Sequence, residues 1–324
     1  MIVISRKTLA STLATFGAAM ALLSTPPAGA QDYECHLGPY ASGADVINWQ
    51  GNHYCPEAYR VYPKKVDCEA SKSYAAPIVE AIKRADELAE KEQETEKARQ
   101  NIAKAQFPLT LKKALSGDGE AQYLAGKAYS DGLVVAKDES SAFDWFSKAA
   151  SSGNQHGENA VGYTYLNGSG GVAKDYAAAL KWFRKAAAQG NAKAEYHLGD
   201  MYFNGWGVPQ NYALALAYYR KAAVAGFDPA EASIGYMYAS GTGVKQDYVE
   251  GNLWYRKAAN QGNDWAQGNL GINYEHGQGV KLDYATAAFW YRRAAKQGNA
   301  DAIKRLHEIP VLQDAPSCGI QIPN

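Results

Sequence analysis

From about residue 117 onward, apolar positions recur with helical spacing, and the whole pattern repeats about every 36 residues. In each unit Ala, Leu, Gly and Tyr stand at positions i, i+4, i+5 and i+8, as in Ala194, Leu198, Gly199 and Tyr202. Residues at these spacings share one side of a helix, so they predict the packed side of a first helix. A period in the thirties is typical of an array of helix pairs.

The second helix of each unit is bounded by residues that start and stop helices. It begins at an Asp or Asn, whose side-chain oxygen accepts from an otherwise unpaired N–H, and it carries an aromatic pair such as Trp182 and Phe183. The capping residues are Asp138, Asp175, Asn211, Asp247 and Asp283. The closing glycines are Gly153, Gly190, Gly226, Gly262 and Gly298. Glycine suits that position because it adopts left-handed backbone, and basic residues in the last turn complement the helix dipole.

A glycine-rich turn joins the two helices, for example "NGWGVPQNY" from Asn204 to Tyr212. Such a loop before a helix N-terminus can bind phosphate. A nucleotide needs one loop, whereas this turn occurs five times, which favours a structural role. A glycine inside the first helix, such as Gly199, costs about 1 kcal/mol relative to alanine. We therefore expect close packing against the partner helix at that position.

The full unit, A-x-x-x-L-G-x-x-Y-x-x-G-x-G-V-x-x-D-Y-x-x-A-x-x-W-Y-x-K-A-A-x-x-G, resembles the Sel-1-like repeat, a relative of the tetratricopeptide repeat. The resemblance covers residues 117–309, and we assign 108–309 to five repeats and a capping half-repeat, "ADAIKRLHEI". It implies an all-α fold, a right-handed α-solenoid of helix pairs whose members scaffold protein complexes. Secreted bacterial members are often regulators, host-interaction factors or envelope proteins.

Residues 1–30 have the features of a secretory signal peptide. Arg6 and Lys7 precede an apolar stretch, and Ala28 and Ala30 form a small-x-small cleavage motif. The alternative is a membrane anchor, but the apolar core is shorter than the ~20 residues that a span needs. We predict cleavage near Ala30, export to the periplasm or the medium, and no membrane segment in the mature chain.

Residues 31–73 carry three of the four cysteines and no helical period, and we interpret them as a small disulfide-tied cap. The alternative is a loose leader held only by its bridges. The four cysteines are Cys35, Cys55, Cys68 and Cys318, the last in a tail of residues 310–324. An even number in an exported protein predicts two disulfides, with three possible pairings. Cys318 must then bond an N-terminal cysteine, with a weak preference for Cys35.

A long polar helix is predicted between the cap and the array, over residues 74–107. Pro77 suits its first turn, and Pro108 disfavours continuation. Its middle, "EKEQETEK", is polar on all sides, so we expect solvent there. A coiled coil is the alternative, although the apolar heptads are interrupted. Such a helix can lie antiparallel to the array and return the N-terminal region to its C-terminal end.

Charge and motifs limit the chemistry. The chain has 33 basic and 33 acidic residues, so no excess of positive charge favours nucleic acid. Its six histidines are single, without metal-ligand spacing. We expect no catalytic site, no cofactor, no metal and a monomer. The predicted function is a non-catalytic scaffold for a protein or peptide. The alternative is an enzyme acting on cell-wall or β-lactam substrates, as assigned to some cysteine-rich relatives, although these repeats contain no cysteine.

The predicted binding residues lie opposite the packed stripe of each first helix. The sixth residue after the repeat Ala points away from that stripe at ~100° per residue. These residues are Lys127, Tyr163, Asp200, Tyr236 and Ile272, flanked by Tyr196, His197 and Asn273. Tyrosine anchors interfaces well because it buries a large area at a low cost in rotamer entropy. The alternative is that Tyr163 and Tyr236 only pack on neighbouring helices.

Overall fold

The computed structural model describes residues 33–37, 47–48, 59–63, 68–309 and 312. The chain divides into two compact units, Met1–Asp67 and Cys68–Asn324. In the first unit, β1 (Tyr33–Leu37) pairs antiparallel with both β2 (Ile47–Asn48) and β3 (Tyr59–Pro63), in the order β2-β1-β3. The sequence did not predict this small sheet. All four cysteine side chains lie outside the residues whose side chains are described, so the disulfide predictions remain untested.

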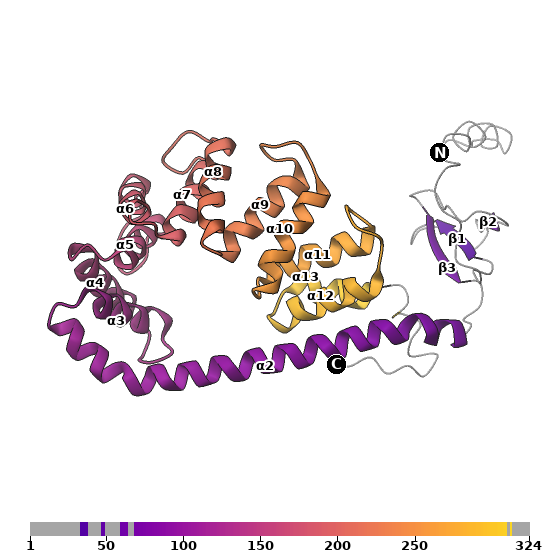
Figure 1. The fold of residues 1–324 in the computed structure, drawn as a ribbon, viewed down its shortest axis with the longest axis horizontal. Helices are drawn as coiled ribbons and strands as arrows, with labels where there is room; N and C mark the ends of the chain where they lie inside the picture. The colour runs from indigo at the N-terminus through magenta and orange to yellow at the C-terminus, as the bar shows by residue number, and fades with distance from the viewer. Residues whose placement is uncertain (1–32, 38–46, 49–58, 64–67, 310–311, 313–324) are drawn as a thin grey trace. The chain divides into compact units, whose positions relative to one another are not determined.

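The second unit is a helical repeat array preceded by one long helix (Figure 1). The long helix is α2 (Cys68–Leu115). The five repeats are the pairs α3 (Gly119–Asp131) and α4 (Glu139–Ser151), α5 (Gln155–Asn167) and α6 (Tyr176–Ala188), α7 (Ala192–Asn204) and α8 (Tyr212–Val224), α9 (Asp228–Ser240) and α10 (Tyr248–Asn260), and α11 (Asp264–His276) and α12 (Tyr284–Lys296). The half-repeat is α13 (Ala300–Glu308). The predicted all-helical repeat fold is confirmed for this unit.

The helix boundaries follow the predicted capping chemistry. Asp175 accepts from the backbone N–H groups of Ala177 and Ala178 at 2.9 and 3.0 Å. The other three aspartates also accept from two N–H groups each, and Asn211 accepts from that of Leu214. Gly190 follows the end of α6 with a φ of +83°, a conformation that residues with a Cβ rarely adopt. The start and stop of each second helix are therefore encoded locally.

The mid-helix glycines pack under aromatic rings, as expected. A Cβ built on Gly199 would lie 2.5 Å from the ring of Tyr219, the second aromatic of the same repeat. The same pairing occurs at Gly126–Phe146, Gly162–Phe183, Gly235–Tyr255 and Gly271–Tyr291. Each ring replaces the missing side chain, which offsets the low helix propensity of glycine.

The glycine-rich turns have a structural role, as predicted. Gly207 has a φ of +68°, and a Cβ there would lie 2.7 Å from the Cβ of Tyr176, the first residue of α6 in the preceding repeat. Gly243 and Gly279 lie in the same way against Tyr212 and Tyr248. The turn therefore joins one repeat to the previous one, which explains why it recurs.

Helix α2 is longer than predicted, since it continues through Pro108 to Leu115. Proline removes one helical hydrogen bond and disfavours the helix before it. The helix continues because its last turns are packed: Leu111 and Ala114 contact the buried Ala121 and Ala125 of α3. Tertiary packing outweighs the local signal at this position. The predicted boundary at residue 107 is therefore wrong, and so is the predicted start, because α2 begins at Cys68.

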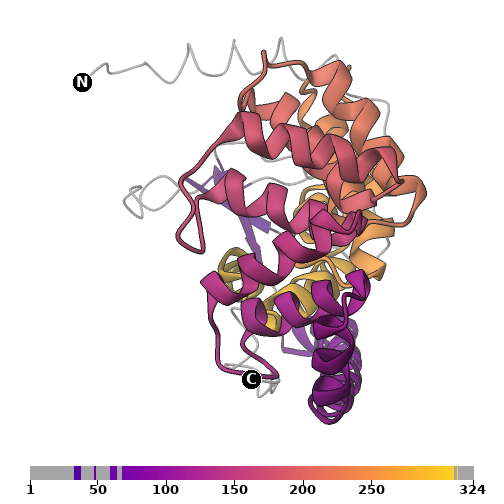
Figure 2. The same ribbon diagram turned by 90° about the vertical axis from the view of Figure 1, so that its left-hand side faces the viewer.

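The other end of α2 packs on the last full repeat. Ile78 and Ile82 are buried in one cluster with Ala288 and Tyr291 of α12. The middle of α2 is exposed, as the sequence predicted. Helix α2 thus contacts both α12 and α3, and it lies below the repeats in Figure 1 and nearly end-on in Figure 2. The expectation that this helix returns along the array is confirmed.

The array curves toward its first helices. Successive first helices contact each other, as α3 does with α5, α9 with α11, and α11 with α13. Among the described helices, successive second helices make at most marginal contact. In a curved stack the elements that approach most closely line the inner side. The first helices therefore form the concave surface, and Figure 2 shows the early pairs stacked on each other.

Candidate functional site: the concave surface

The first helices of the five repeats present equivalent positions to solvent along the concave surface. We call one such set, Lys127, Tyr163, Asp200, Tyr236 and Ile272, the concave row. Lys127, Tyr163 and Tyr236 are exposed, whereas Asp200 and Ile272 are half-buried. Side chains opposite this row are buried, because they face the second helix of the same repeat. The row is thus the accessible side of the first helices.

The two tyrosines of the row contact the next repeat and remain open to solvent. Tyr163 is 51% exposed, and its ring centroid lies 5.4 Å from that of His197. Tyr236 is 39% exposed and lies 5.8 Å from Trp265. Each ring is held by an aromatic neighbour at a distance typical of favourable aromatic pairs. Packing on a neighbour and availability to a partner are therefore compatible here.

Asp200, His197 and Tyr196 form a half-buried cluster at the middle of the row. Asp200 accepts a hydrogen bond of 2.8 Å from the hydroxyl of Tyr219. His197 stacks on Phe183 at 4.8 Å, and its Nδ1 lies 3.9 Å from Asp200 Oδ2, beyond hydrogen-bonding distance. Burial, and then the neighbouring Asp200 carboxylate, raise the pKa of Tyr196. The phenols of this cluster therefore remain neutral hydrogen-bonding groups.

The two ends of the row differ from its middle. Lys127 donates to Asp131 at 2.6 Å, and this hydrogen bond raises the pKa of Lys127. Ile272 packs against the cluster formed by α2 and α12. Asn273 is only 5% exposed and donates to Asn252 at 2.6 Å. The prediction that Asn273 flanks an accessible row is therefore wrong, because its side chain points into the interface between repeats.

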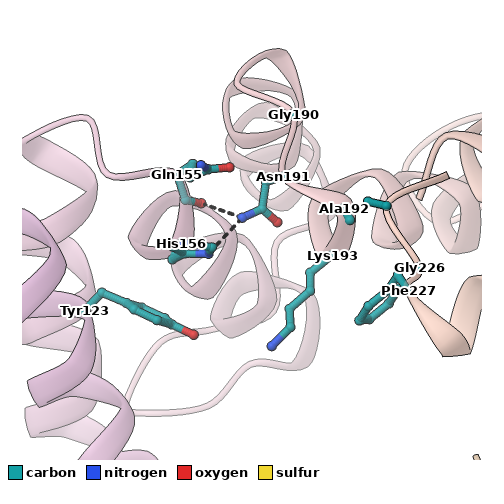
Figure 3. A pocket seen from close by; sticks show the side chains of 10 residues that line it. Tyr123, Gln155, His156, Gly190, Asn191, Ala192, Lys193, Gly226 and Phe227 are labelled. Carbon is teal, nitrogen blue, oxygen red and sulfur yellow. Dashed lines mark hydrogen bonds between the residues drawn. The ribbon is translucent and has the colours of Figure 1, made fainter. Parts of the chain in front are cut away.

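A hollow of about 400 Å³ lies beside the row, at the N-terminal ends of α5, α7 and α9. Its lining residues are Tyr123, Gln155, His156, Gly190, Asn191, Ala192, Lys193, Ala225, Gly226 and Phe227. Asn191 caps α7 and contacts Nδ1 of His156 at 3.1 Å, as drawn in Figure 3. The N-cap of α9 is instead Phe227, whose side chain supplies no capping hydrogen bond. Lys193 is exposed and extends from α7 on the Tyr123 side of the hollow (Figure 3).

Sequence reasoning missed the aromatic residues beside the row. Trp265 is 42% exposed, and His156 stacks with Tyr123 at 5.2 Å. Trp265 and His156 occupy the same repeat position, seven residues before the concave row. The other repeats carry Glu120, Lys193 and Pro229 at this position, so the alignment of the repeats gives no recurring aromatic signal there. With Tyr163 and Tyr236, these residues add aromatic groups to the concave surface, beside the exposed charges of Glu120, Lys127 and Lys193.

The described part of the chain shows no cluster of His, Cys, Asp or Glu that could hold a metal ion. Over the same residues, none of the helices combines the length and hydropathy that a membrane span requires. The side chains that the surface does present are aromatic rings, hydroxyls, amides and a few charges. Such groups contact a macromolecular segment by area and by hydrogen bonds.

Comparisons with known proteins agree with this architecture. Residues 119–154, 155–191, 192–227, 228–263 and 266–299 each match the Sel1 repeat. A solved Sel1 repeat protein from Oxalobacter formigenes is 37% identical with a TM-score of 0.54, over 64% of this chain and 81% of that protein. No curated protein matches the chain.

A second solved structure is c5321, a protective antigen of uropathogenic Escherichia coli strains with an SLR fold. It is 30% identical with a TM-score of 0.54 and covers 80% of this chain. The chain spans only about half of that antigen, 54% of its length. The likeness therefore concerns the repeat array and leaves a large part of the antigen without a counterpart.

Proposed function

We propose, from the premise that this chain belongs to the Sel1 repeat family, that it is an exported, non-catalytic scaffold that binds a protein partner on its concave surface. Sel1 repeat arrays generally act as protein-interaction scaffolds. The observation that carries the proposal is the pair Tyr163 and Tyr236. Both are exposed at the same repeat position, two repeats apart, and each is held by an aromatic neighbour.

The geometry of the row favours an extended segment of the partner. Neighbouring first helices lie ~10 Å apart, so two repeat steps span ~20 Å. An extended chain covers ~3.3 Å per residue, so six or seven residues reach from one tyrosine to the other. The two rings are anchors of low rotamer entropy, and the hollow at the N-terminal ends of α5, α7 and α9 accommodates a larger side chain.

Export is part of the same proposal and rests on residues 1–30. Arg6, Lys7, the apolar stretch and the Ala28–Ala30 motif support removal of a signal peptide. Mass spectrometry of the N-terminus of the protein from periplasmic and culture fractions is the test. A mature chain that begins near Gln31 in either fraction supports export. An intact N-terminus in the cytoplasm contradicts it.

The concave surface is tested by the double variant Tyr163→Ala, Tyr236→Ala. We expect loss of both anchors to weaken partner capture at least tenfold, because interface tyrosines commonly contribute more than 1 kcal/mol each. Capture is measured by cross-linking the purified chain in envelope extract and quantifying the same partner by mass spectrometry. The matched control is Tyr74→Ala, which removes a tyrosine 56% exposed on α2.

Two results contradict the proposal. One is unchanged capture by the double variant when its melting temperature equals that of the parent chain. The other is turnover of nitrocefin by the purified mature chain, which favours the enzymatic alternative. If the double variant unfolds, the single variant Tyr163→Ala, whose ring is half-exposed, provides the same comparison.

A further inference from the structure

The second helix of the last repeat is covered by a helix of this chain. Arg292 of α12 binds Asp86 of α2 through two hydrogen bonds of 2.7 and 3.2 Å, and Arg293 donates to Glu92 at 2.6 Å. On the same side, the guanidinium of Arg84 lies 5.1 Å from the ring centre of Phe289. One apolar residue and two basic residues of α12 thus hold an acid-rich helix.

The same positions are open one repeat earlier. One period before Phe289, Arg292 and Arg293, helix α10 carries Leu253, Arg256 and Lys257. Leu253 is 51% exposed, and its neighbour Val249, one turn before, is 59% exposed. We call these four residues of α10 the α10 face. A shallow hollow of about 320 Å³ lies there, lined by Leu253, Arg256, Lys257, Glu250, Trp254 and Asn260.

We infer that the α10 face is a docking site for an acidic amphipathic helix of a partner protein. The chain itself shows this recognition on α12, where the segment from Asp86 to Glu96 contains six acidic residues and one lysine. The α10 face supplies the matching chemistry, with two apolar side chains beside two cations. This surface is separate from the concave surface, so the inference does not depend on the proposed function.

The cations of the α10 face are already oriented. Arg256 donates to the hydroxyl of Tyr274 at 3.0 Å, and the Lys257 ammonium lies 4.0 Å from the ring centre of Trp254. Neither cation forms an ion pair with another described side chain, and Glu250, the acidic residue among those lining the hollow, instead accepts a hydrogen bond of 2.8 Å from the indole N–H of Trp254. A helix that brings carboxylates therefore finds fixed cations with little loss of rotamer entropy.

The neighbouring second helices lack the apolar half of this face. The counterpart of Leu253 is Ala217 in α8 and Lys181 in α6. Both helices keep the basic pair, so they offer charge without an apolar contact. The α10 face also differs from its counterpart on α12: Ala288 of α12 packs with α2, whereas its equivalent Asn252 donates a hydrogen bond of 2.7 Å to the backbone carbonyl of Gln278 in the next repeat. We expect binding weaker than the intramolecular contact of α2.

The test uses a fluorescent synthetic peptide of residues 76–99 of this chain as the probe, titrated against the full chain at low salt. We expect saturable binding of one peptide per chain, and at least a tenfold loss of affinity with Leu253→Asp, Arg256→Glu. The matched control is Ala217→Asp, Arg220→Glu in α8, which should change affinity less than twofold. A peptide carrying Asp86→Arg and Glu92→Lys should recover binding to Arg256→Glu, Lys257→Glu.

Several results overturn the inference. One is the absence of saturable peptide binding, and another is an equal loss of affinity in the α8 control. A third is binding that is weakened by Arg292→Glu but not by the α10 variant, because that result means that the peptide displaces α2. Sedimentation with phosphatidylglycerol vesicles that depends on Arg256, without peptide binding, would assign the face to anionic lipid instead. If the α10 double variant melts early, the single variant Lys257→Glu replaces it.

Discussion

The contacts between repeats and the contact between α2 and α12 hold the second unit together in different ways. Between repeats, the same small set of contacts is used again. A glycine turn lies on a helix start, and an arginine of one repeat donates to a tyrosine hydroxyl of the next, as Arg256 does to Tyr274 at 3.0 Å and Arg220 to Tyr238 at 2.8 Å. The contact of α2 with α12 occurs once and combines Ile78 and Ile82 with the pair Arg292–Asp86. Many small contacts divide the stabilisation among the repeats, whereas a single contact concentrates it in a few residues.

The largest expected effect is loss of the single contact. Ile82 is fully buried, so Ile82→Ala should destabilise the second unit by about 2–5 kcal/mol, as core truncations do. The matched control is Ile102→Ala on the exposed middle of the same helix, where Ile102 is 57% exposed and we expect a change within about 0.5 kcal/mol. Urea unfolding followed by circular dichroism measures both. Equal effects of the two changes would show that α2 is not held on α12.

A repeated packing site should be less sensitive to a single change. Gly199→Leu places a side chain where a Cβ already lies 2.5 Å from the Tyr219 ring, so we expect a loss of about 1–3 kcal/mol. The control is Gly268→Ala in α11, where the nearest atom to a new Cβ is 3.7 Å away. That change should be neutral or stabilising, because alanine favours the helix. A melting temperature of Gly199→Leu equal to that of the parent would refute close packing at this position.

The ion pair of the single contact should contribute less than its apolar part. Asp86→Asn removes the charge that Arg292 binds in a partly buried site, and we expect a loss of about 1–3 kcal/mol. The control is Glu96→Gln, whose exposed partner Arg99 lies 3.8 Å away and should matter little. Thermal melts in low and high salt compare the two. The idea fails if Asp86→Asn melts with the parent chain at both salt concentrations.

The smallest effect concerns a polar contact within one repeat, the hydrogen bond of 2.7 Å that Gln261 at the end of α10 donates to Glu231 of α9. Burial raises the pKa of Glu231, so the native state disfavours its ionised form. The contribution of protonated Glu231 to the free energy of unfolding is fully present below its unfolded pKa of about 4.3, and it is lost as pH rises through its folded pKa. Glu231→Gln retains an acceptor for Gln261, so it should raise the melting temperature slightly at pH 7 and not at pH 4. A rise of equal size at both pH values would contradict this assignment.

The sequence predicts the repeated contacts well because the residues that form each contact recur at the same position in several repeats. A single Asp175 before a helix is a weak signal, whereas five equivalent caps and five equivalent glycines define boundaries that the structure confirms. The exposed Tyr163 and Tyr236 followed from the same register, because the packed stripe fixes the opposite side of the helix. Repetition therefore replaces the information that a single motif lacks.

Contacts made once were not predictable in the same way. The spacing of Ile78 and Ile82 shows that α2 has an apolar side, but nothing in the sequence pairs that side with Ala288 or Asp86 with Arg292. Pro108 gave a false boundary because local preference says nothing about the packing of Leu111 on α3. Asn273 was misplaced for a related reason, since its position depends on Asn252 in the preceding repeat.

The position of α2 also has a consequence for how the chain folds. An open solenoid contains only near-neighbour contacts, so it can nucleate at any repeat and lose its end repeats first. Here residues 206 positions apart, Asp86 and Arg292, must meet before the last repeat is covered. Such a closure adds a large entropic search, which slows folding. It also ties the two terminal repeats to one helix, so that fraying at either end disturbs the other, and the array should unfold as a single cooperative unit.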